Sequence, residues 1–127
     1  MTFPAETPVP PYYAVIFTST RTPGDEGYGA MADHMEQLAA TMPGFLGVES
    51  VRDAGSAGAP GITVAYWASL EAIAGWKAHG EHQLAQRLGR ERWYEDYRVR
   101  VCKVEREYGF SRAADAGAPA GEAVGAR

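Results

Sequence analysis

Two segments of this chain are apolar, aromatic or β-branched at almost every position: YYAVIFTS (12–19) and ITVAYW (62–67). Successive side chains of a β-strand point to opposite faces of a sheet, so a strand with one face in water alternates apolar and polar residues. These two segments do not alternate, which predicts strands that are covered on both faces. Any fold for this chain must therefore cover both sides of one sheet.

Between these strands the apolar spacing changes to that of a helix. From Tyr28 to Met42 the steps are three and four residues, which places the apolar side chains on one helical stripe, and Pro43-Gly44 ends the helix. The segment FLGVESV (45–51) reads as a short strand, followed by the flexible connection 53–61.

A second helix is predicted after Ser69, a suitable N-cap residue. Gly80 favours a break, so we expect this helix in two pieces ending at Gly89. The apolar positions of its sheet-facing stripe are Leu70, Ile73, Leu84 and Leu88. The segment RERWYED is a turn or irregular link, and residues 97–109 form the last strand.

The resulting order, β-α-β-β-α-β, predicts an α+β fold of the ferredoxin-like type: a four-stranded antiparallel sheet with both helices on one face. The domain occupies residues 12–110. Residues 1–11 carry four prolines and form an extended arm, and residues 111–127 form a disordered Ala/Gly-rich tail. Two helices cover only one side of the sheet, so we expect a homodimer in which a second sheet covers the other side.

Charge and composition exclude several classes of protein. The formal net charge is −4, which argues against nucleic-acid binding. No apolar run approaches the ~20 residues of a membrane span, and the N-terminus lacks the features of a secretory signal. A single cysteine, Cys102, fits a reducing cytoplasm and is expected in the core. We expect the arginines at 87, 90, 92, 98 and 100 to form ion pairs with Glu91, Glu95 and Asp96.

Three segments, PGFLGVESV (43–51), ITVAYWASLEAIAGWKAHGEH (62–82) and RVRVCKVEREYG (98–109), resemble the antibiotic biosynthesis monooxygenase (ABM) domain. The resemblance covers about residues 12–109 and implies a dimeric α+β barrel with an apolar cavity between helices and sheet in each subunit. Members of this family include cofactor-independent monooxygenases of polycyclic aromatic polyketides, quinol monooxygenases and haem-degrading monooxygenases. Many members have no established activity.

The haem-degrading members of this family use an asparagine, a tryptophan and a haem-ligating histidine. In this sequence the tryptophan position corresponds to Trp76, the histidine position to Gln86 and the asparagine position to Phe17. One of the three matches, and His79 or His82 replaces the ligand only with a shift of register. Haem is therefore kept as the alternative to a site without a cofactor.

The candidate catalytic residues are Trp76, His79 and His82, which lie three residues apart. On a continuous helix Trp76 falls at the edge of the apolar face, whereas both histidines point to the opposite side, towards solvent. The alternative is a histidine at a cavity mouth, as a proton shuttle or haem ligand. Two histidines without further ligands do not make a metal site.

Five further residues are candidates for substrate binding, although core packing is the alternative for the aromatic ones. They are Tyr66, Trp67, Arg92, Trp93 and Tyr94.

The sequence thus favours an oxygenase that uses molecular oxygen on a small aromatic quinol or polyketide-like substrate, without metal or flavin. The two alternatives are a haem-binding or haem-degrading protein and a dimeric binding domain without catalytic activity.

Overall fold

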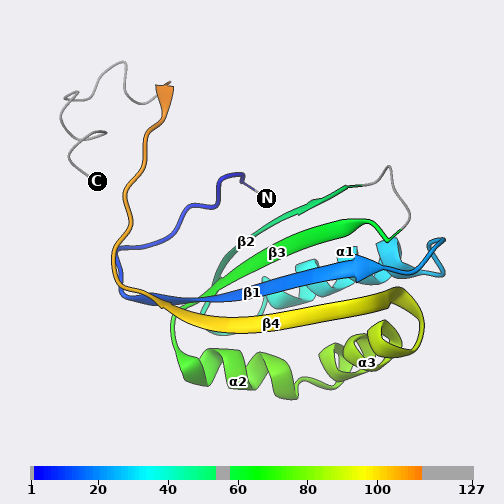
Figure 1. The fold of residues 1–127 in the computed structure, drawn as a ribbon. Helices are drawn as coiled ribbons and strands as arrows, with labels where there is room; N and C mark the ends of the chain where they lie inside the picture. Colours follow the sequence, from blue (N-terminus) through cyan, green and yellow to red (C-terminus); the bar gives the residue numbers. More distant parts are fainter. Residues whose placement is uncertain (1, 54–57, 113–127) are drawn as a thin grey trace.

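The computed structural model of the chain describes residues 2–53 and 58–112, whose four strands form one antiparallel sheet in the order β2-β3-β1-β4 (Figure 1). The strands are β1 (Tyr12–Arg21), β2 (Phe45–Arg52), β3 (Pro60–Trp67) and β4 (Tyr94–Val104). The helices are α1 (Tyr28–Ala39), α2 (Leu70–Ala78) and α3 (Gly80–Leu88), and a short π-helical turn, η1 (Gly89–Trp93), precedes β4. The two segments predicted to be covered on both faces are the central strands, and the ferredoxin-like order is confirmed.

The two faces of the sheet carry different layers (Figure 1). The helices lie on one face, which we call the helix face; in β1 it presents Tyr13, Val15 and Phe17, opposite Trp67, Ala65 and Thr63 of β3. The other face, which we call the open face, carries no helix of the described residues. The N-terminal arm and the segment after β4 rise on this side at one end of the sheet (Figure 1).

The turn from α1 to β2 requires glycine for two reasons. Gly44 has φ 82°, and a Cβ atom built on it would lie 2.6 Å from the Cβ of Ala72 in α2. Its carbonyl also accepts a hydrogen bond from the backbone N–H of Ala68 at 2.8 Å. This close approach fixes α2 against the start of β2.

The second helix is broken, as predicted, but its apolar stripe does not continue through the break. His79 has an extended backbone (ψ 131°) between α2 and α3. Leu70 and Leu84 are 52% and 39% exposed, so the prediction that they cover the sheet is wrong. The stripe assumed a continuous helix, whereas an extended residue resets the rotation of everything after it.

The last strand begins and ends earlier than predicted. It starts at Tyr94, inside the segment predicted as a link, and ends at Val104. Val104 pairs with Tyr12, the first residue of β1, so the five residues that follow have no neighbouring strand to pair with. A strand pattern in sequence forms a strand only where a partner is available.

Two expectations about individual side chains are wrong. Cys102 is exposed, because it lies on the edge strand and points to the open face with its register partner Ala14. No ion pair joins the five arginines of residues 87–100 to Glu91, Glu95 or Asp96, all of which the structure describes. The arginines instead remain in solvent or donate to hydroxyl groups, as Arg100 does to Thr18 at 3.5 Å.

Candidate functional site

An aromatic column crosses from the sheet to the helices. Phe45 of β2 meets Trp67 edge to face, with ring centroids 5.4 Å apart. Trp67 stacks on Trp76 of α2 at 6.1 Å, and Trp76 stacks on His82 of α3 at 4.4 Å with an interplanar angle of 21°. Trp67 is 1% exposed, whereas Trp76 and His82 are half-buried. The column therefore runs from the core to an accessible imidazole.

The break in the second helix places His82 on Trp76. Ser69 caps α2 by accepting a hydrogen bond from the N–H of Ala72 at 3.0 Å. His79 then caps α3 in the same way, with its Nδ1 accepting from the N–H of Glu81 at 3.2 Å. A new helix start after His79 turns α3 so that His82 faces back towards Trp76.

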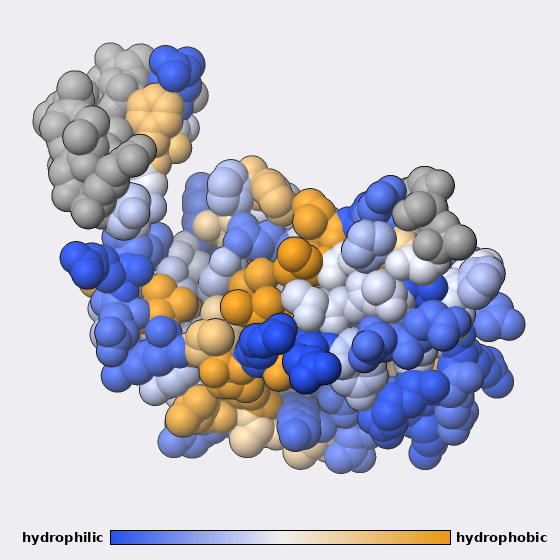
Figure 2. Space-filling model, viewed as in Figure 1, coloured by the Kyte–Doolittle hydropathy of each residue, from blue (hydrophilic) through white to orange (hydrophobic). Residues whose placement is uncertain are grey.

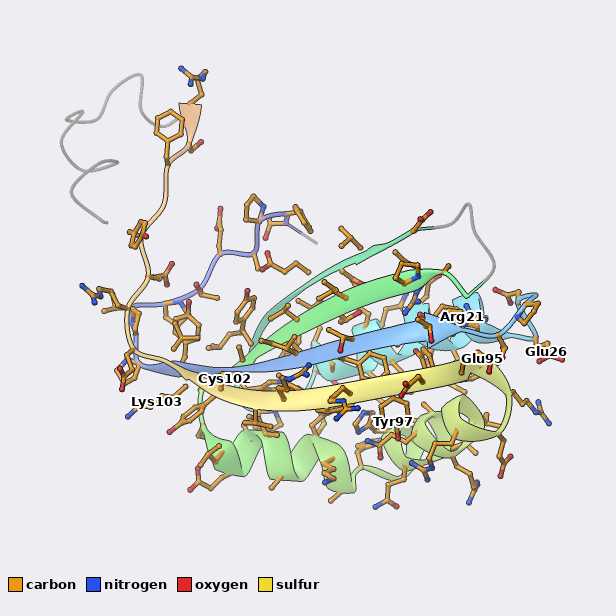
Figure 3. All side chains as sticks on the ribbon, viewed as in Figure 1. Arg21, Glu26, Glu95, Tyr97, Cys102 and Lys103 are labelled. Carbon is orange, nitrogen blue, oxygen red and sulfur yellow. The ribbon has the colours of Figure 1, made fainter. Side chains whose placement is uncertain are left out.

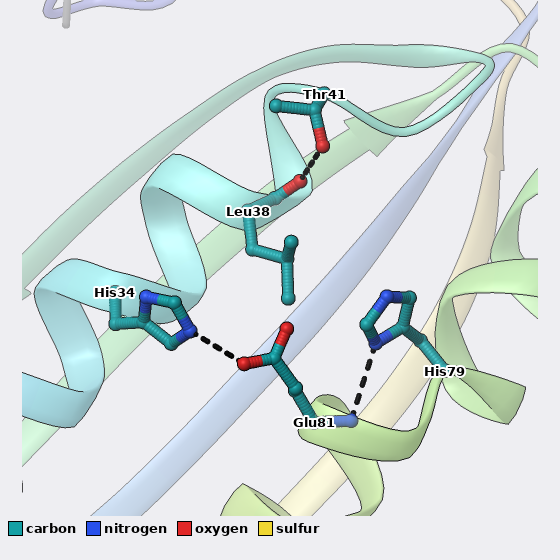
Figure 4. Close-up of polar contacts among 5 residues, drawn as sticks. All are labelled: His34, Leu38, Thr41, His79 and Glu81. Atoms are coloured by element: carbon teal, nitrogen blue, oxygen red, sulfur yellow. Dashed lines mark hydrogen bonds and ion pairs between the residues drawn. The ribbon is translucent and has the colours of Figure 1, made fainter.

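A contact between helices holds the start of α3. Glu81 Oε1 lies 2.9 Å from His34 Nε2 of α1, and Figure 4 shows Glu81 between His34 and His79. Both partners of this pair are about half exposed, at 50% and 53%. The pair ties α3 to α1 at the end of the helix from which His82 projects.

The hydrogen bonding of His82 fixes its tautomer. Its Nδ1 lies 3.2 Å from the backbone carbonyl of Trp76, and a carbonyl oxygen only accepts hydrogen bonds. Nδ1 therefore carries the proton, which leaves the lone pair on Nε2. Burial lowers the pKa of His82 below its ordinary value, and nearby His79 and Lys77 lower it further, against an opposing effect of the Trp76 carbonyl. At neutral pH the group is an uncharged base.

The structure thus brings together the three residues predicted as catalytic. His79 lies against Trp76, with centroids 6.0 Å apart, and His82 stacks on it. The prediction that His82 points away from Trp76 is wrong, because it assumes one continuous helix, whereas the extended His79 separates α2 from α3.

A second aromatic cluster lies at the other end of the helix face. Phe17 of β1 stacks on Tyr97 at 5.2 Å and meets Tyr94 edge to face at the same distance. Tyr28 of α1 packs edge to face against Tyr94 and Trp93, at 5.8 and 5.9 Å. Figure 3 shows Tyr97 on the side of β4 that faces α3.

Arginine closes this second cluster. The guanidinium of Arg21 lies 3.6 Å above the ring of Tyr28, donates from Nε to the carbonyl of Trp93 at 2.8 Å and is 9% exposed. Burial raises the pKa of Tyr94, and the hydrogen bond that its hydroxyl donates to Tyr28 raises it further, so the hydroxyl stays protonated. Each polar atom named here already has a partner inside the protein.

The five residues predicted to bind substrate do not form one group. Tyr66 points to the open face and donates to Glu49, because it follows Ala65 and precedes Trp67 on a strand whose side chains alternate. Trp67 is in the core of the column. Trp93 is buried and donates from Nε1 to the carbonyl of Glu26 at 3.1 Å, with Tyr94 beside it.

Arg92, the fifth residue, is exposed on η1, and its carbonyl accepts from Thr22 Oγ1 at 2.6 Å.

Sequence reasoning missed the apolar surface beside the column. Val99 and Val101 of β4 share the helix face with Phe17 and Val15, yet they are 46% and 50% exposed. Figure 2 shows apolar side chains gathered on the visible face of the molecule, in the area of β4 and α2. Their alternation with Arg98 and Arg100 in the sequence was the available signal. This alternation predicts that one face of the strand is apolar, but it does not show that Val99 and Val101 stay exposed on the helix face.

Two hollows in the described part of the chain lie away from Trp76 and His82, although Phe45 at the base of the column lines the smaller one. A groove of about 740 Å³ opens on the open face, and a smaller hollow of about 370 Å³ lies between the N-terminal arm, α1 and β2. Among residues 2–53 and 58–112, no three His, Cys, Asp or Glu side chains are grouped to hold a metal ion. No described helix is long and apolar enough to cross a membrane.

The sequence of this chain is similar to that of known proteins. A family model described as "Antibiotic biosynthesis monooxygenase" matches residues 11–88. The protein YqjZ of Bacillus subtilis (strain 168), described as uncharacterized, is 56% identical over 107 residues, which cover 84% of this chain and 91% of YqjZ.

Solved structures share the fold at low identity. SnoaB, a cofactor-independent oxygenase from Streptomyces nogalater, is 11% identical, with a TM-score of 0.64 over 77% of this chain and 97% of SnoaB. Rv0793 from Mycobacterium tuberculosis is 16% identical, with a TM-score of 0.65 over 76% of this chain and 97% of that one. Both carry the same α+β architecture.

Proposed function

Because this chain belongs to the antibiotic biosynthesis monooxygenase family, we propose that it is a cofactor-independent monooxygenase that oxidises a small aromatic quinol or polyketide-like phenol. The observation that carries this proposal is the uncharged His82, stacked on Trp76 with its Nε2 lone pair available. SnoaB, described as a cofactor-independent oxygenase, has the same fold.

The proposed reaction requires a base and a binding surface from the protein. For a phenol with an acidic ring methylene, Nε2 of His82 takes a proton, and the resulting carbanion passes electrons to molecular oxygen. One oxygen atom becomes a ring carbonyl in place of the two hydrogens, and the other leaves as water. The substrate supplies all four electrons, so the balance needs no metal or flavin.

The surface beside the column suits an aromatic ring. Val99 and Val101 offer exposed apolar area on the helix face. We propose that the substrate ring lies on this area with its acidic hydrogen near Nε2 of His82. His79 supports this arrangement as the cap of α3, and its contact with Trp76 limits the movement of the indole.

Oxygen uptake tests the proposal. We expect consumption of oxygen with one or more members of a panel of quinols and anthrone-like phenols, and loss of uptake in His82→Ala. Gln83→Ala, an exposed neighbour on α3, is the matched control and should retain activity. Folded protein that consumes no oxygen with any substrate would favour the binding domain without catalytic activity.

The haem alternative fits the structure less well. At the asparagine position of haem-degrading relatives, Phe17 packs its ring between Tyr94 and Tyr97 and offers no polar atom. Gln86, at the position of their ligand, is not a residue that ligates haem iron. Haem addition that gives a Soret band in the wild type, and none in His82→Ala, would overturn this reading.

We also propose that the protein is a homodimer through its open face. Val51 and Ile62 are 57% and 46% exposed there, and Ile16 and Val64 are half-buried. A second sheet packed on this face would bury roughly 2,000 Å² in total, the size of an obligate interface. At about 25 cal/mol per Å² of apolar area, such burial exceeds the net stability of a small domain. Sedimentation at low micromolar concentration should show twice the 13.7 kDa of one chain.

A further inference from the structure

The groove on the open face lies at one end of the sheet. Its floor includes the exposed apolar side chains of Val51 and Ile62, and its volume is about 740 Å³. Thr18, Arg98 and Arg100 form its other side, on the register that links β1 to β4. No residue beyond Val104 takes part in the lining. The groove therefore combines apolar area with three guanidinium groups, those of Arg52, Arg98 and Arg100.

The segment Glu105–Phe110, which we call the C-terminal strap, leaves the opposite end of the sheet. It continues from Val104, where the pairing of β4 with β1 ends, and rises away from the body of the molecule (Figure 1). Tyr108 and Phe110 are 56% and 53% exposed on it. More than half of each aromatic side chain is thus left in water, and its further burial would be favourable.

The base of the strap is anchored. Glu107 Oε1 accepts hydrogen bonds from Thr7 Oγ1 at 2.9 Å and from the hydroxyl of Tyr12 at 3.1 Å. Burial raises the pKa of Tyr12, and Glu107 contributes to this shift, so the phenol remains a donor. These contacts bind the strap to the N-terminal arm and to the first residue of β1, and they fix the direction in which Tyr108 leaves.

We propose that the C-terminal strap of one copy fills the open-face groove of a second copy, and that the exchange is reciprocal. The proposal rests on the homodimer proposed above. It adds that the aromatic residues Tyr108 and Phe110 are the part of the partner that enters the groove.

The strap is too short for the groove of its own chain. From Tyr12, where Glu107 is anchored, to Thr18 in the groove is six strand positions, or about 20 Å. The three residues from Tyr108 to Phe110 span about 10 Å at full extension. Its own groove is therefore out of reach while the anchor holds.

A partner groove is within reach. Consider a two-fold axis that lies between two stacked sheets and runs perpendicular to their strands. This axis reverses the strand direction, so the strap end of one copy lies above the groove end of the other. Stacked sheets are about 10 Å apart, which the free end of the strap can span. The symmetry then fills both grooves with the same contacts.

The chemistry of the two surfaces is complementary. Aromatic rings would cover Val51 and Ile62, and Arg98 and Arg100 offer guanidinium groups for the ring faces. Arg112 already approaches the ring of Phe110 in this way, at 5.1 Å from its centroid. Neither Arg98 nor Arg100 forms an ion pair with Glu91, Glu95 or Asp96.

Association measurements test the exchange. We expect Tyr108→Ser/Phe110→Ser to weaken dimerisation at least tenfold in sedimentation equilibrium. The matched control, Leu70→Ser/Leu84→Ser, removes two exposed apolar side chains from the helix layer on the other side of the sheet and should leave association unchanged. A wild-type dimer with unaltered association in the strap variant overturns the exchange alone. A wild-type monomer at all concentrations overturns the dimer as well.

Disulfide trapping gives the second test, in a Cys102→Ser background. Ile62→Cys places a thiol in the groove, and Gly109→Cys places one in the strap, where a Cβ atom meets nothing within 4 Å. Mixing the two single-cysteine proteins, one carrying a mass tag, should give a covalent heterodimer on oxidation. An internal disulfide in the monomeric double-cysteine chain would show that the strap returns to its own groove. A dimer that forms neither bond would also overturn the exchange.

Discussion

The two aromatic clusters of the helix face are built from similar residues but differ in their polar atoms. The column of Trp67, Trp76 and His82 ends in an imidazole whose Nε2 is available. The cluster around Trp93 and Tyr94 is closed, because Arg21 and backbone carbonyls take up its polar groups. The first stands beside exposed apolar surface, whereas the second joins α1, η1 and two strands.

This difference separates a candidate site from a structural cluster. Aromatic rings alone indicate neither, since both clusters stack their rings at comparable distances. A site needs a polar group that is desolvated enough to be reactive and is not already satisfied. His82 meets this condition, and Trp93 does not.

The largest effect is expected from breaking the closed cluster. Trp93→Ala should lower the free energy of unfolding by about 3–5 kcal/mol, because a buried indole that is 4% exposed leaves a cavity and its partner carbonyl is left unpaired. Trp93→Phe keeps most of the packing and should lose about 1–2 kcal/mol. Urea denaturation measures both. Equal losses would mean that the hydrogen bond, and not the packing, stabilises this cluster.

His82→Ala should show the opposite pattern. We expect oxygen uptake to fall about a hundredfold or more, since a positioned base contributes 10²–10⁴ in rate, while stability changes little. Uptake by the folded fraction of Trp93→Phe, measured in parallel, should stay near the wild-type value. Loss of activity in Trp93→Phe at unchanged folding would place the second cluster in the site as well.

Much of the fold follows from local sequence. The central position of β1 and β3 follows from their two-sided apolar pattern, and the helix positions follow from spacing. The end of β4 does not follow from local sequence, because it depends on where its partner strand begins, at Tyr12. The stack of Phe17 on Tyr97 likewise depends on register between strands far apart in the chain.

The residues of the candidate site could be predicted from the sequence, but their arrangement could not. Trp76, His79 and His82 were identified by spacing alone. Their arrangement was not, because it depends on one backbone angle at His79, and the spacing assumed a continuous helix. Tyr66 and Trp67 are neighbours in sequence but lie on opposite faces of the sheet, so one of the two had to lie away from the column.

The pH dependence sharpens the contrast further. The pKa of His82 is lowered in the folded protein, so the unfolded chain binds more protons between that value and its ordinary pKa of about 6.5. Stability should therefore rise with pH through this window and level off above it. Oxygen uptake should level off at a lower pH than stability does, because the base of the folded protein, with its lowered pKa, is already unprotonated within this window. His82→Gln should remove this contribution to the slope, measured as urea midpoints at pH 5 and pH 8. An unchanged slope would place the titration elsewhere.

The smallest effect is expected at the His34–Glu81 pair, which holds the start of α3. Both side chains are about half exposed, at 50% and 53%, so solvent and salt screen their attraction. Removing the pair should cost roughly 0.2–1 kcal/mol at low ionic strength and almost nothing in 1 M salt. His34→Ala removes the pair alone, whereas Glu81→Gln also removes a negative charge from the first turn of α3, where it favours the helix. A larger loss in Glu81→Gln than in His34→Ala would assign the difference to the helix terminus. Equal losses would assign the whole effect to the contact between α1 and α3.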